Sequence, residues 1–504
     1  MKKMYPKIEP KFLLMYSPQI FDKKFGAIKP EGSLGLMYLA GALRDKNYPV
    51  TILDATVGND KYTLKETFYN EIILPDGMIR VGMSIEDIIK EVKDYDVIGL
   101  SSIFTAQTRM VKEVVQAIRN TYPKKLIILG GGNAKAQMQY FFDAGADLVC
   151  LSESEETIID IAKILEKGER DFSKIDGLAG KEGFLNPKLK VIYDLDELPI
   201  PAWDLVPMKK YWEIARPHGG GLKEGNVAYA PVMFSRGCPY KCLYCHNSKE
   251  SEGSLGGNTG KYRMKSINRI IKELNILINL GVKYVFIEDD SLLAKKERAK
   301  EIFSKVKEMG LQLADVNGIN LAHLYTKVDG KLGVDEPLME LLAAAGFKRL
   351  QYPVESASQR ILNKYATGKF NLKKHDVIGL IKKANQLGIE IVGNYTFGYP
   401  DETFVEILKT LFLAKKHMAA GLNAANFMFI TPFPGTKLYD YVVENNILRD
   451  DFNLESMDWT HPSMKTKVPG WFIRLVITRG WRWVNKPERI KRIKGFSTTK
   501  NINV

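Results

Sequence analysis

The chain has 504 residues but only four cysteines, and three of them, Cys238, Cys242 and Cys245, lie within eight residues of one another. This clustering does not fit a disulfide framework, which uses dispersed cysteine pairs. No run of about 18 apolar residues occurs, so the sequence offers no transmembrane helix. The early apolar run, Phe12–Met15, is too short for a secretory signal. We therefore expect a cytoplasmic protein whose clustered cysteines bind metal.

The net charge of +14 is unevenly distributed along the chain. From Lys465 to the end there are eleven Lys or Arg residues and one acid, Glu488. The rest of the chain is only mildly basic, so nucleic-acid binding is not expected. The basic segment also holds Trp471, Trp481 and Trp483, residues that favour a membrane–water interface. Two hypotheses stay open: a tail that makes peripheral contact with the inner membrane face, or a helix packed on the protein with solvated charges.

Residues 1–168 alternate apolar strand signals with amphipathic helix signals. The spacing predicts helices at Gly35–Lys46 and Ser84–Val92. The expected strands are Phe12–Ser17, Val50–Asp54, Val97–Ser101, Leu126–Leu129 and Leu148–Leu151. Near-continuous apolar strands separated by helices indicate a doubly wound parallel sheet of the flavodoxin-like kind.

A connector rich in acids and prolines, 169–227, leads to a second domain, 228–448, with six strand–helix repeats. The expected strands are Val232–Ser235, Tyr284–Ile287, Leu311–Asn317, Arg349–Val354, Glu390–Phe397 and Ala425–Ile430. Six such units predict a partial (β/α)6 barrel of the TIM type, with chemistry at the C-terminal strand ends. The repeat stops before the basic C-terminal segment, 449–504.

The cysteine triplet directly follows the first barrel strand. Three thiolates can hold a four-iron, four-sulfur cubane and leave one iron without a protein ligand. That iron can bind the amino and carboxylate groups of S-adenosylmethionine (SAM). The alternative from the residues alone is a zinc site with His246 as fourth ligand, although structural zinc sites usually show two separated ligand pairs.

The cysteine spacing, with Tyr244 before the third cysteine, resembles the signature of the radical SAM superfamily. Later segments resemble the family at strand ends, among them Phe397–Thr403, where Asp401 departs from the usual glycine, and Thr431–Thr436. The resemblance implies a 4Fe-4S cluster on the three cysteines and cleavage of SAM to a 5′-deoxyadenosyl radical. It also implies SAM contacts at Tyr244, Glu288, Asp289, Asp290 and Glu355.

The first domain resembles the cobalamin-binding domain of a subgroup of these enzymes. The implied cofactor contacts are Gly32, Gly35, Ser101, Ser102, Gly130, Gly131, Gly132, Asn133, Glu153 and Ser154. Asn133 stands where relatives often have His, and Ser152 and Ser154 replace glycines. On composition alone, these small residues only form tight strand-to-helix turns. There is no Asp-x-His-x-x-Gly sequence, so no histidine is placed to ligate cobalt from below.

The resemblance implies a class B cobalamin-dependent radical methyltransferase acting on an unactivated carbon. It extends to the anaerobic magnesium-protoporphyrin ester cyclases, so an oxidative cyclase or rearrangement enzyme is the alternative. A non-catalytic protein that binds zinc and nucleic acid is the third hypothesis. Methylthio transfer is not expected, because only Cys150 precedes the triplet. The implied partners are a small-molecule or lipid-like substrate and a flavodoxin- or ferredoxin-type electron donor.

Overall fold

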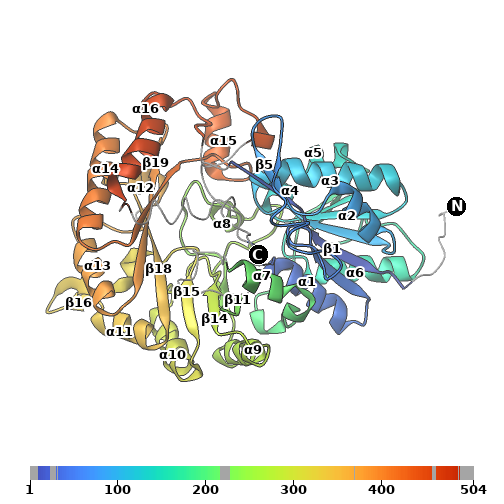
Figure 1. The fold of residues 1–504 in the computed structure, drawn as a ribbon, viewed down its shortest axis with the longest axis horizontal. Coiled ribbons are helices and arrows are strands. Elements are labelled where there is room, and N and C mark those ends of the chain that lie inside the picture. The colour runs from blue at the N-terminus through green and yellow to red at the C-terminus, as the bar shows by residue number, and fades with distance from the viewer. Residues whose placement is uncertain are drawn as a thin grey trace.

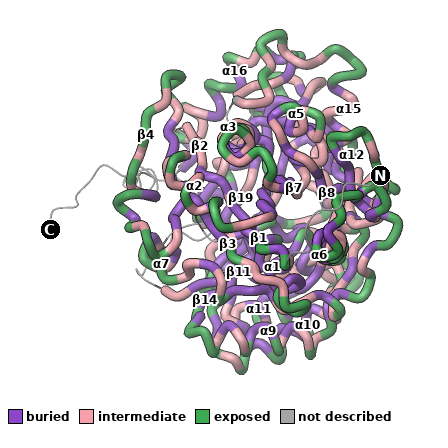
Figure 2. Tube along the Cα trace, turned by 90° about the vertical axis from the view of Figure 1, so that its right-hand side faces the viewer, coloured by how far each residue is buried: buried purple, intermediate pink, exposed green. Residues whose placement is uncertain are grey.

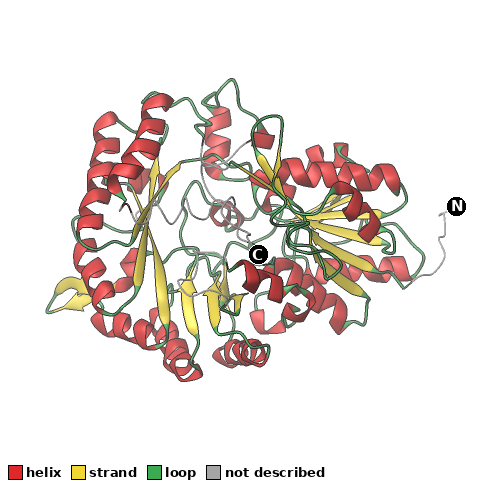
Figure 3. Cartoon of the chain, in the orientation of Figure 1, coloured by secondary structure: helices red, strands yellow, loops and turns green. Residues whose placement is uncertain are grey.

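The computed structural model describes residues 9–22, 30, 32–215, 227–367, 369–456, 461–485 and 487. Two α/β units lie side by side, an N-terminal sheet with helices on both faces and a strand–helix barrel (Figures 1 and 3). The sheets form the buried layer in each unit, and the helices outside them carry most of the exposed surface (Figure 2). The predicted fold class is confirmed.

The N-terminal sheet has seven strands in the order β10-β9-β8-β7-β6-β1-β3. Its parallel strands are β1 (Phe12–Tyr16), β3 (Val50–Asp54), β6 (Val97–Ser101), β7 (Leu126–Gly130) and β8 (Leu148–Cys150). The helices are α1 (Leu34–Asp45), α2 (Ile85–Val92), α3 (Thr108–Thr121), α4 (Gly132–Ala136), α5 (Met138–Asp143) and α6 (Glu155–Glu166). These strands fall where the apolar runs predict them.

Two antiparallel strands, β9 (Leu178–Gly180) and β10 (Leu185–Asn186), extend this sheet beyond β8. They lie within the stretch that the sequence assigns to a connector. A further small sheet, β2 (Gln19–Phe21), β4 (Ile72–Ile73) and β5 (Ile79–Val81), forms beside it. The first part of this connector therefore extends the N-terminal sheet, and helix α7 (Met208–Ile214) follows it.

The barrel sheet has the order β11-β14-β15-β18-β19-β20, with every pair parallel. The strands are β11 (Tyr229–Val232), β14 (Tyr284–Ile287), β15 (Gln312–Asp315), β18 (Phe347–Glu355), β19 (Glu390–Phe397) and β20 (Ala424–Phe429). The helices are α8 (His246–Glu250), α9 (Ile267–Asn279), α10 (Lys296–Val306), α11 (Glu336–Ala344), α12 (Gln359–Tyr365), α13 (Val377–Gln386), α14 (Phe404–Ala419) and α15 (Lys437–Glu444).

The first barrel strand begins three residues before the predicted start, Val232. The apolar run continues to Phe234, but the Phe234 amide donates to the Asp289 carboxylate at 2.6 Å and not to a neighbouring strand. The chain then forms a two-residue hairpin pair, β12 (Ser235–Arg236) with β13 (Arg263–Met264). A second hairpin, β16 (Tyr325–Val328) with β17 (Lys331–Val334), lies outside the barrel.

Tryptophan side chains cap both open edges of the partial barrel. On β11, the indole nitrogens of Trp203 and Trp212 donate to the carbonyls of Pro231 and Tyr229 at 3.0 and 2.8 Å. On β20, the indole of Trp481 donates to the Ala425 carbonyl at 3.0 Å. These bonds satisfy backbone groups that an open sheet edge would leave unpaired.

The C-terminal helices pack against the barrel. Helix α16 (Gly470–Leu475), a π-helical turn (Val476–Gly480) and α17 (Trp481–Val484) follow one another. Ile473, Val476, Ile477 and Val484 are buried. The side chain of Asn485 bonds both the amide and the carbonyl of Ala425. Residues 470–485 therefore pack on the barrel, which does not decide between the two hypotheses for their exposed side, whereas 457–460, 486 and 488–504 lie outside the described residues.

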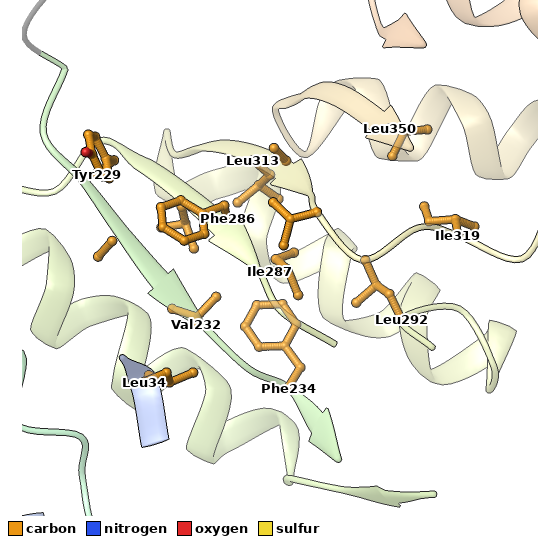
Figure 4. Packing of buried hydrophobic residues seen from close by; sticks show 14 of the residues in the cluster. Leu34, Tyr229, Val232, Phe234, Phe286, Ile287, Leu292, Leu313, Ile319 and Leu350 are labelled. Carbon is orange, nitrogen blue, oxygen red and sulfur yellow. The ribbon is translucent and has the colours of Figure 1, made fainter. Parts of the chain in front are cut away.

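The two domains share one continuous apolar core. Buried residues of both sheets belong to the same cluster, and Leu34 of α1 lies beside Val232 of β11 (Figure 4). In the described part of the chain, no helix has the length and apolar character needed to cross a bilayer.

Candidate active site

The cysteine loop is fixed by glycine and by the hairpin β12–β13. Gly237 has φ +77°, and a Cβ there would lie 2.3 Å from the Lys261 carbonyl, so only glycine fits. The Cys238 amide donates to the Gly260 carbonyl at 3.0 Å, and the Leu243 amide to the Tyr365 carbonyl at 2.9 Å. The loop is thereby held at the C-terminal end of β11, where the barrel fold places its chemistry.

The three thiols lie in a largely buried setting. Burial raises the pKa of Cys245 to about 12 and also raises that of Cys238, and in both the Asp290 charge acts in the same direction. A thiolate here therefore needs a positive partner such as a metal centre. No three His, Cys, Asp or Glu side chains of the described residues converge on a single ion position. A cubane does not require that, because each thiolate binds its own iron.

Glu355 ends β18 and faces the cysteine loop. It has φ +63°, a left-handed conformation that non-glycine residues adopt mainly at strained functional positions. Its carboxylate accepts from Tyr244 Oη at 2.9 Å and from Thr396 Oγ1 at 2.7 Å. The structure thus brings the predicted contacts Tyr244 and Glu355 together beside the triplet.

Lys369 is a site residue that no sequence motif indicates. Its Nζ lies 3.6 Å from Glu355 Oε1 and 5.8 Å from the centre of the Tyr244 ring. Burial alone would lower the pKa of Lys369, but the charges of Glu355 and the three cysteines raise it. The ammonium group is therefore placed to compensate the negative charge of thiolates that hold a cluster.

The three acidic residues after β14, Glu288, Asp289 and Asp290, lie in different environments. Asp289 is 1% exposed, and its carboxylate accepts from the Phe234 amide and from Ser235 Oγ. Asp290 is exposed and accepts from the Gly237 amide at 3.2 Å, and Glu288 is half-buried. The Asp289 carboxylate thus braces the strand before the cysteine loop, and its contact with the cofactor stays a prediction.

His246, the zinc ligand of the alternative hypothesis, has another partner. Its Nε2 lies 3.0 Å from the Pro434 carbonyl, in the loop after β20. Its ring also lies near Gly132 of the N-terminal sheet, 3.8 Å from where a Cβ would stand. His246 therefore lies at the junction of the cysteine loop and the first domain.

The predicted cobalamin turns gather at one edge of the N-terminal sheet. The turns after β6, β7 and β8 and the one before α1 all lie at the carboxyl ends of parallel strands, the usual ligand-binding edge. Gly131 has φ +106°, and a Cβ there would lie 2.5 Å from the Ser102 carbonyl. At the same edge, Ile103 and Phe104 are exposed apolar side chains. Close-packed glycine turns and an apolar rim fit a large, flat ligand such as a corrin.

Asn133 is buried within a polar network. Its side-chain amide donates to Ser102 Oγ at 2.8 Å and to Thr108 Oγ1 at 3.1 Å. Ser101 is also buried. Gly130 ends β7, Gly131 follows it, and Gly132 begins α4. The Asn133 side chain therefore joins the turn after β7 to the turn after β6 and keeps the backbone of both in place.

At the turn after β8, polar side chains join the two domains. The Glu153 carboxylate forms two hydrogen bonds with the Arg263 guanidinium, at 2.6 and 2.9 Å. Glu155 accepts from Arg236 at 2.6 Å, and Ser152 Oγ donates to the Gly256 carbonyl at 2.7 Å. Ser154 Oγ donates to the Ser152 carbonyl. Side chains of Glu153 and Ser152 thus hold the sheet edge against the barrel, and this contact is the role the geometry supports for Glu153.

The remaining predicted contacts, Gly32 and Gly35, flank the start of α1. Gly32 has φ +76° and packs against Tyr211 of α7, whose hydroxyl donates to Asp54 at 2.8 Å. Ser33 caps the helix by accepting from the Leu36 amide. This turn also lies at the carboxyl edge of the sheet, beside β1 and β3.

Together, the fold and the site define a two-domain α/β protein in which a ligand-binding sheet edge meets the mouth of a barrel that carries three clustered thiols. Comparison with known families agrees. Residues 232–414 match the radical SAM superfamily, and residues 30–162 match the B12-binding domain.

The chain is 28% identical over 443 residues to an uncharacterised methyltransferase of Pyrococcus horikoshii, covering 86% of this chain and 83% of the relative. It is 27% identical to cytidylyl-2-hydroxyethylphosphonate methyltransferase of Streptomyces wedmorensis, covering 87% and 82%. Among solved structures, the radical SAM methyltransferase TsrM of Kitasatospora setae has a TM-score of 0.62 at 15% identity, covering 86% of this chain and 76% of that one. The TsrM likeness supports the fold.

The chain therefore combines a radical SAM domain with a B12-binding domain, and the resemblance predicted from the sequence is confirmed. Its cofactors are a 4Fe-4S cluster, SAM and cobalamin. The hypothesis of a non-catalytic zinc protein is wrong.

Proposed function

We propose that this enzyme transfers a methyl group to an unactivated carbon of a small-molecule or lipid-like substrate held between its two domains. One observation carries the proposal: the cysteine loop and the glycine turn after β7 meet at His246, which brings the two predicted cofactor sites next to each other. The methyltransferase names of the two relatives favour methyl transfer over cyclisation.

In this proposal the bound cluster supplies the electron that cleaves SAM, and bound cobalamin supplies the methyl carrier. The residues of the chain position both. Cys238, Cys242 and Cys245 hold the cluster, Glu355 and Tyr244 bind SAM, and Lys369 balances the thiolate charge. A reductant of the flavodoxin or ferredoxin type delivers the electron.

The remaining predicted contacts form the cobalamin turns in this proposal. The backbone at Ser101, Ser102 and Gly130–Asn133 provides the close approach, and Gly32 and Gly35 provide the neighbouring turn. Asp290 and Glu288 remain candidate SAM contacts, because neither is enclosed in the way that Asp289 is.

The decisive experiment uses enzyme purified without oxygen, supplied with cobalamin and with SAM carrying a deuterated methyl group. The candidate substrates are extracts separated into polar and apolar fractions. The proposal predicts a product that gains the labelled methyl carbon, together with 5′-deoxyadenosine. A product that is oxidised or cyclised without label would establish the cyclase alternative.

We also propose that the C-terminal segment contacts the inner membrane face. The exposed Trp471 and Trp483 and the neighbouring arginines support this location, since both residue types favour the membrane–water interface.

A further inference from the structure

Large apolar side chains are exposed on three neighbouring helices. On α14 and on the C-terminal helices α16 and α17, seven such residues face outward: Phe404, Val405, Leu408, Phe412, Trp471, Leu475 and Trp483. We call this surface the α14/α17 face. Trp471 is 70% exposed and Phe412 is 59% exposed, which is far above what packing within the fold requires.

Contacts between the helices make these residues one surface. The rings of Phe404 and Phe472 lie 4.9 Å apart at one end, and those of Phe412 and Trp483 lie 5.8 Å apart at the other. Lys415 bridges the helices by donating to the Trp483 carbonyl at 2.7 Å. The helices lie beside each other on the outer side of the barrel (Figure 1).

The opposite side of each helix is already buried. Ile407 and Ala414 of α14 and Ile473 and Val476 of the C-terminal helices lie in the barrel core. An amphipathic helix normally turns polar residues to the other side. Here the outward side carries large apolar residues among its cations, so these apolar residues have a purpose outside the packing of this chain.

Cations dominate the exposed charge on the helices of this face. Exposed cations rim it: Lys409, Lys416, Arg474, Arg479 and Arg482. Glu406 is the one acid on the described residues of α14, α16 and α17, and it is paired with Arg360 at 2.8 Å. A partner for this face must therefore be apolar within and anionic at its surface.

We propose that the α14/α17 face docks on a bilayer surface that contains anionic phospholipid. Tryptophan and phenylalanine enter the headgroup region, and the basic rim attracts the phosphates. This inference rests on the proposed membrane contact, and extends it from the tail to a barrel helix. A proteinaceous partner would need complementary acids, whereas a lipid headgroup layer provides anions at every position along the face.

The face begins at the reactive end of the barrel. Helix α14 starts after Thr403, only a few residues beyond the Phe397–Glu402 turn that ends β19. Thr396 in β19 donates to the Glu355 carboxylate in the site. A docked enzyme would therefore hold the mouth end of its barrel close to the membrane, where an apolar substrate resides.

The test is co-sedimentation of the full-length protein with vesicles, in the absence of any turnover. One vesicle preparation contains phosphatidylcholine alone, and the other is rich in phosphatidylglycerol. The variant is F412Q/W471Q/W483Q, and the matched control, I73Q/L189Q/V328Q, changes three exposed apolar residues elsewhere. Circular dichroism checks that both variants fold.

The wild type and the control variant should bind phosphatidylglycerol vesicles at least about tenfold more strongly than phosphatidylcholine vesicles, and added salt should weaken the binding. The F412Q/W471Q/W483Q variant should lose this binding. Failure of the wild type to bind, or equal binding by this variant, would overturn the proposal. The proposal would also be overturned if light scattering showed that the wild type is a dimer that does not bind vesicles and that the variant is a monomer. The face would then bind a second copy of the chain.

Production of 5′-deoxyadenosine without vesicles provides the separate readout for the proposed function. The F412Q/W471Q/W483Q variant should retain it, since none of its three residues contacts the site. Failure of the wild type to bind vesicles with this activity intact would overturn only the membrane inference, whereas absence of methyl transfer with vesicle binding intact would overturn only the proposed reaction.

Discussion

The pairing of Glu153 with Arg263 should be the strongest polar tie between the two domains. The side chains are 15% and 4% exposed, and two hydrogen bonds of 2.6 and 2.9 Å join them. Burial alone would raise the pKa of Glu153, but the guanidiniums of Arg263 and Arg236 hold it below its usual range. Its contribution to stability is therefore present above the unfolded-state pKa and is lost as the pH falls through the lowered folded-state value.

Replacing Arg263 by leucine leaves the Glu153 carboxylate with a reduced set of partners in a buried setting. Removing one member of a buried ion pair costs about 3–5 kcal/mol, and Arg236, whose Nη1 lies 3.3 Å from Glu153, places the expected loss near the lower figure. The matched control is R44L. Arg44 also forms two hydrogen bonds with a carboxylate, that of Asp204, but these side chains are 42% and 51% exposed. Exposed pairs contribute about 0–1 kcal/mol.

Urea unfolding of the anaerobic protein at neutral pH measures both effects. The double variant E153Q/R263L should be more stable than R263L, because it removes the orphaned charge along with its partner. The reasoning is refuted if R263L loses no more stability than R44L, or if the double variant is no more stable than R263L.

Three further predictions follow from the site. Lys369→Met should make the reduction potential of the cluster more negative, on the order of tens of millivolts, because the added negative charge of the reduced cluster is no longer compensated by the ammonium group. Lys369→Arg keeps a cation and should leave the potential unchanged. A redox titration followed by electron paramagnetic resonance tests both variants. Glu355→Gln should reduce 5′-deoxyadenosine formation at least about tenfold, or about 1.4 kcal/mol, with iron content unchanged; equal rates would remove Glu355 from the SAM site. Burial raises the pKa of Glu402 to about 8. Since this lies above the unfolded-state value, folding takes up a proton, and stability should fall between about pH 5 and 8. In Glu402→Gln that decline should be smaller in thermal melts, and an unchanged profile would contradict the assignment.

Sequence patterns predicted most of the scaffold because the parallel strands are buried on both faces. The near-continuous runs Val97–Ser101 and Glu390–Phe397 are strands with the predicted bounds. Strand β9 was not foreseen, since Leu178–Gly180 offers only three residues without alternation. The end of the first barrel strand was predicted too late, because buried Phe234 extends the apolar run after the chain has left the sheet.

Within the site, local motifs indicated the cysteines, Tyr244 and Glu355, whose neighbours in sequence form a recognisable pattern. They could not indicate Lys369, which belongs to no motif and reaches the site only when the loop after α12 folds back. Nor could they show that the Glu153 carboxylate meets Arg263, 110 residues further along the chain. Such pairings depend on how the two domains pack together, which is determined by residues throughout the shared core.

The account depends on Cys238, Cys242 and Cys245 acting together as ligands of one cluster. The most direct test measures iron, acid-labile sulfide and 5′-deoxyadenosine in anaerobic wild-type enzyme and in the single variants C238A, C242A and C245A, with C150A as the control. The account predicts about four irons and four sulfides per chain in the wild type and in C150A, and loss of the cluster and of SAM cleavage in each of the other three. Full iron content and unchanged SAM cleavage in any one of those three variants would contradict it.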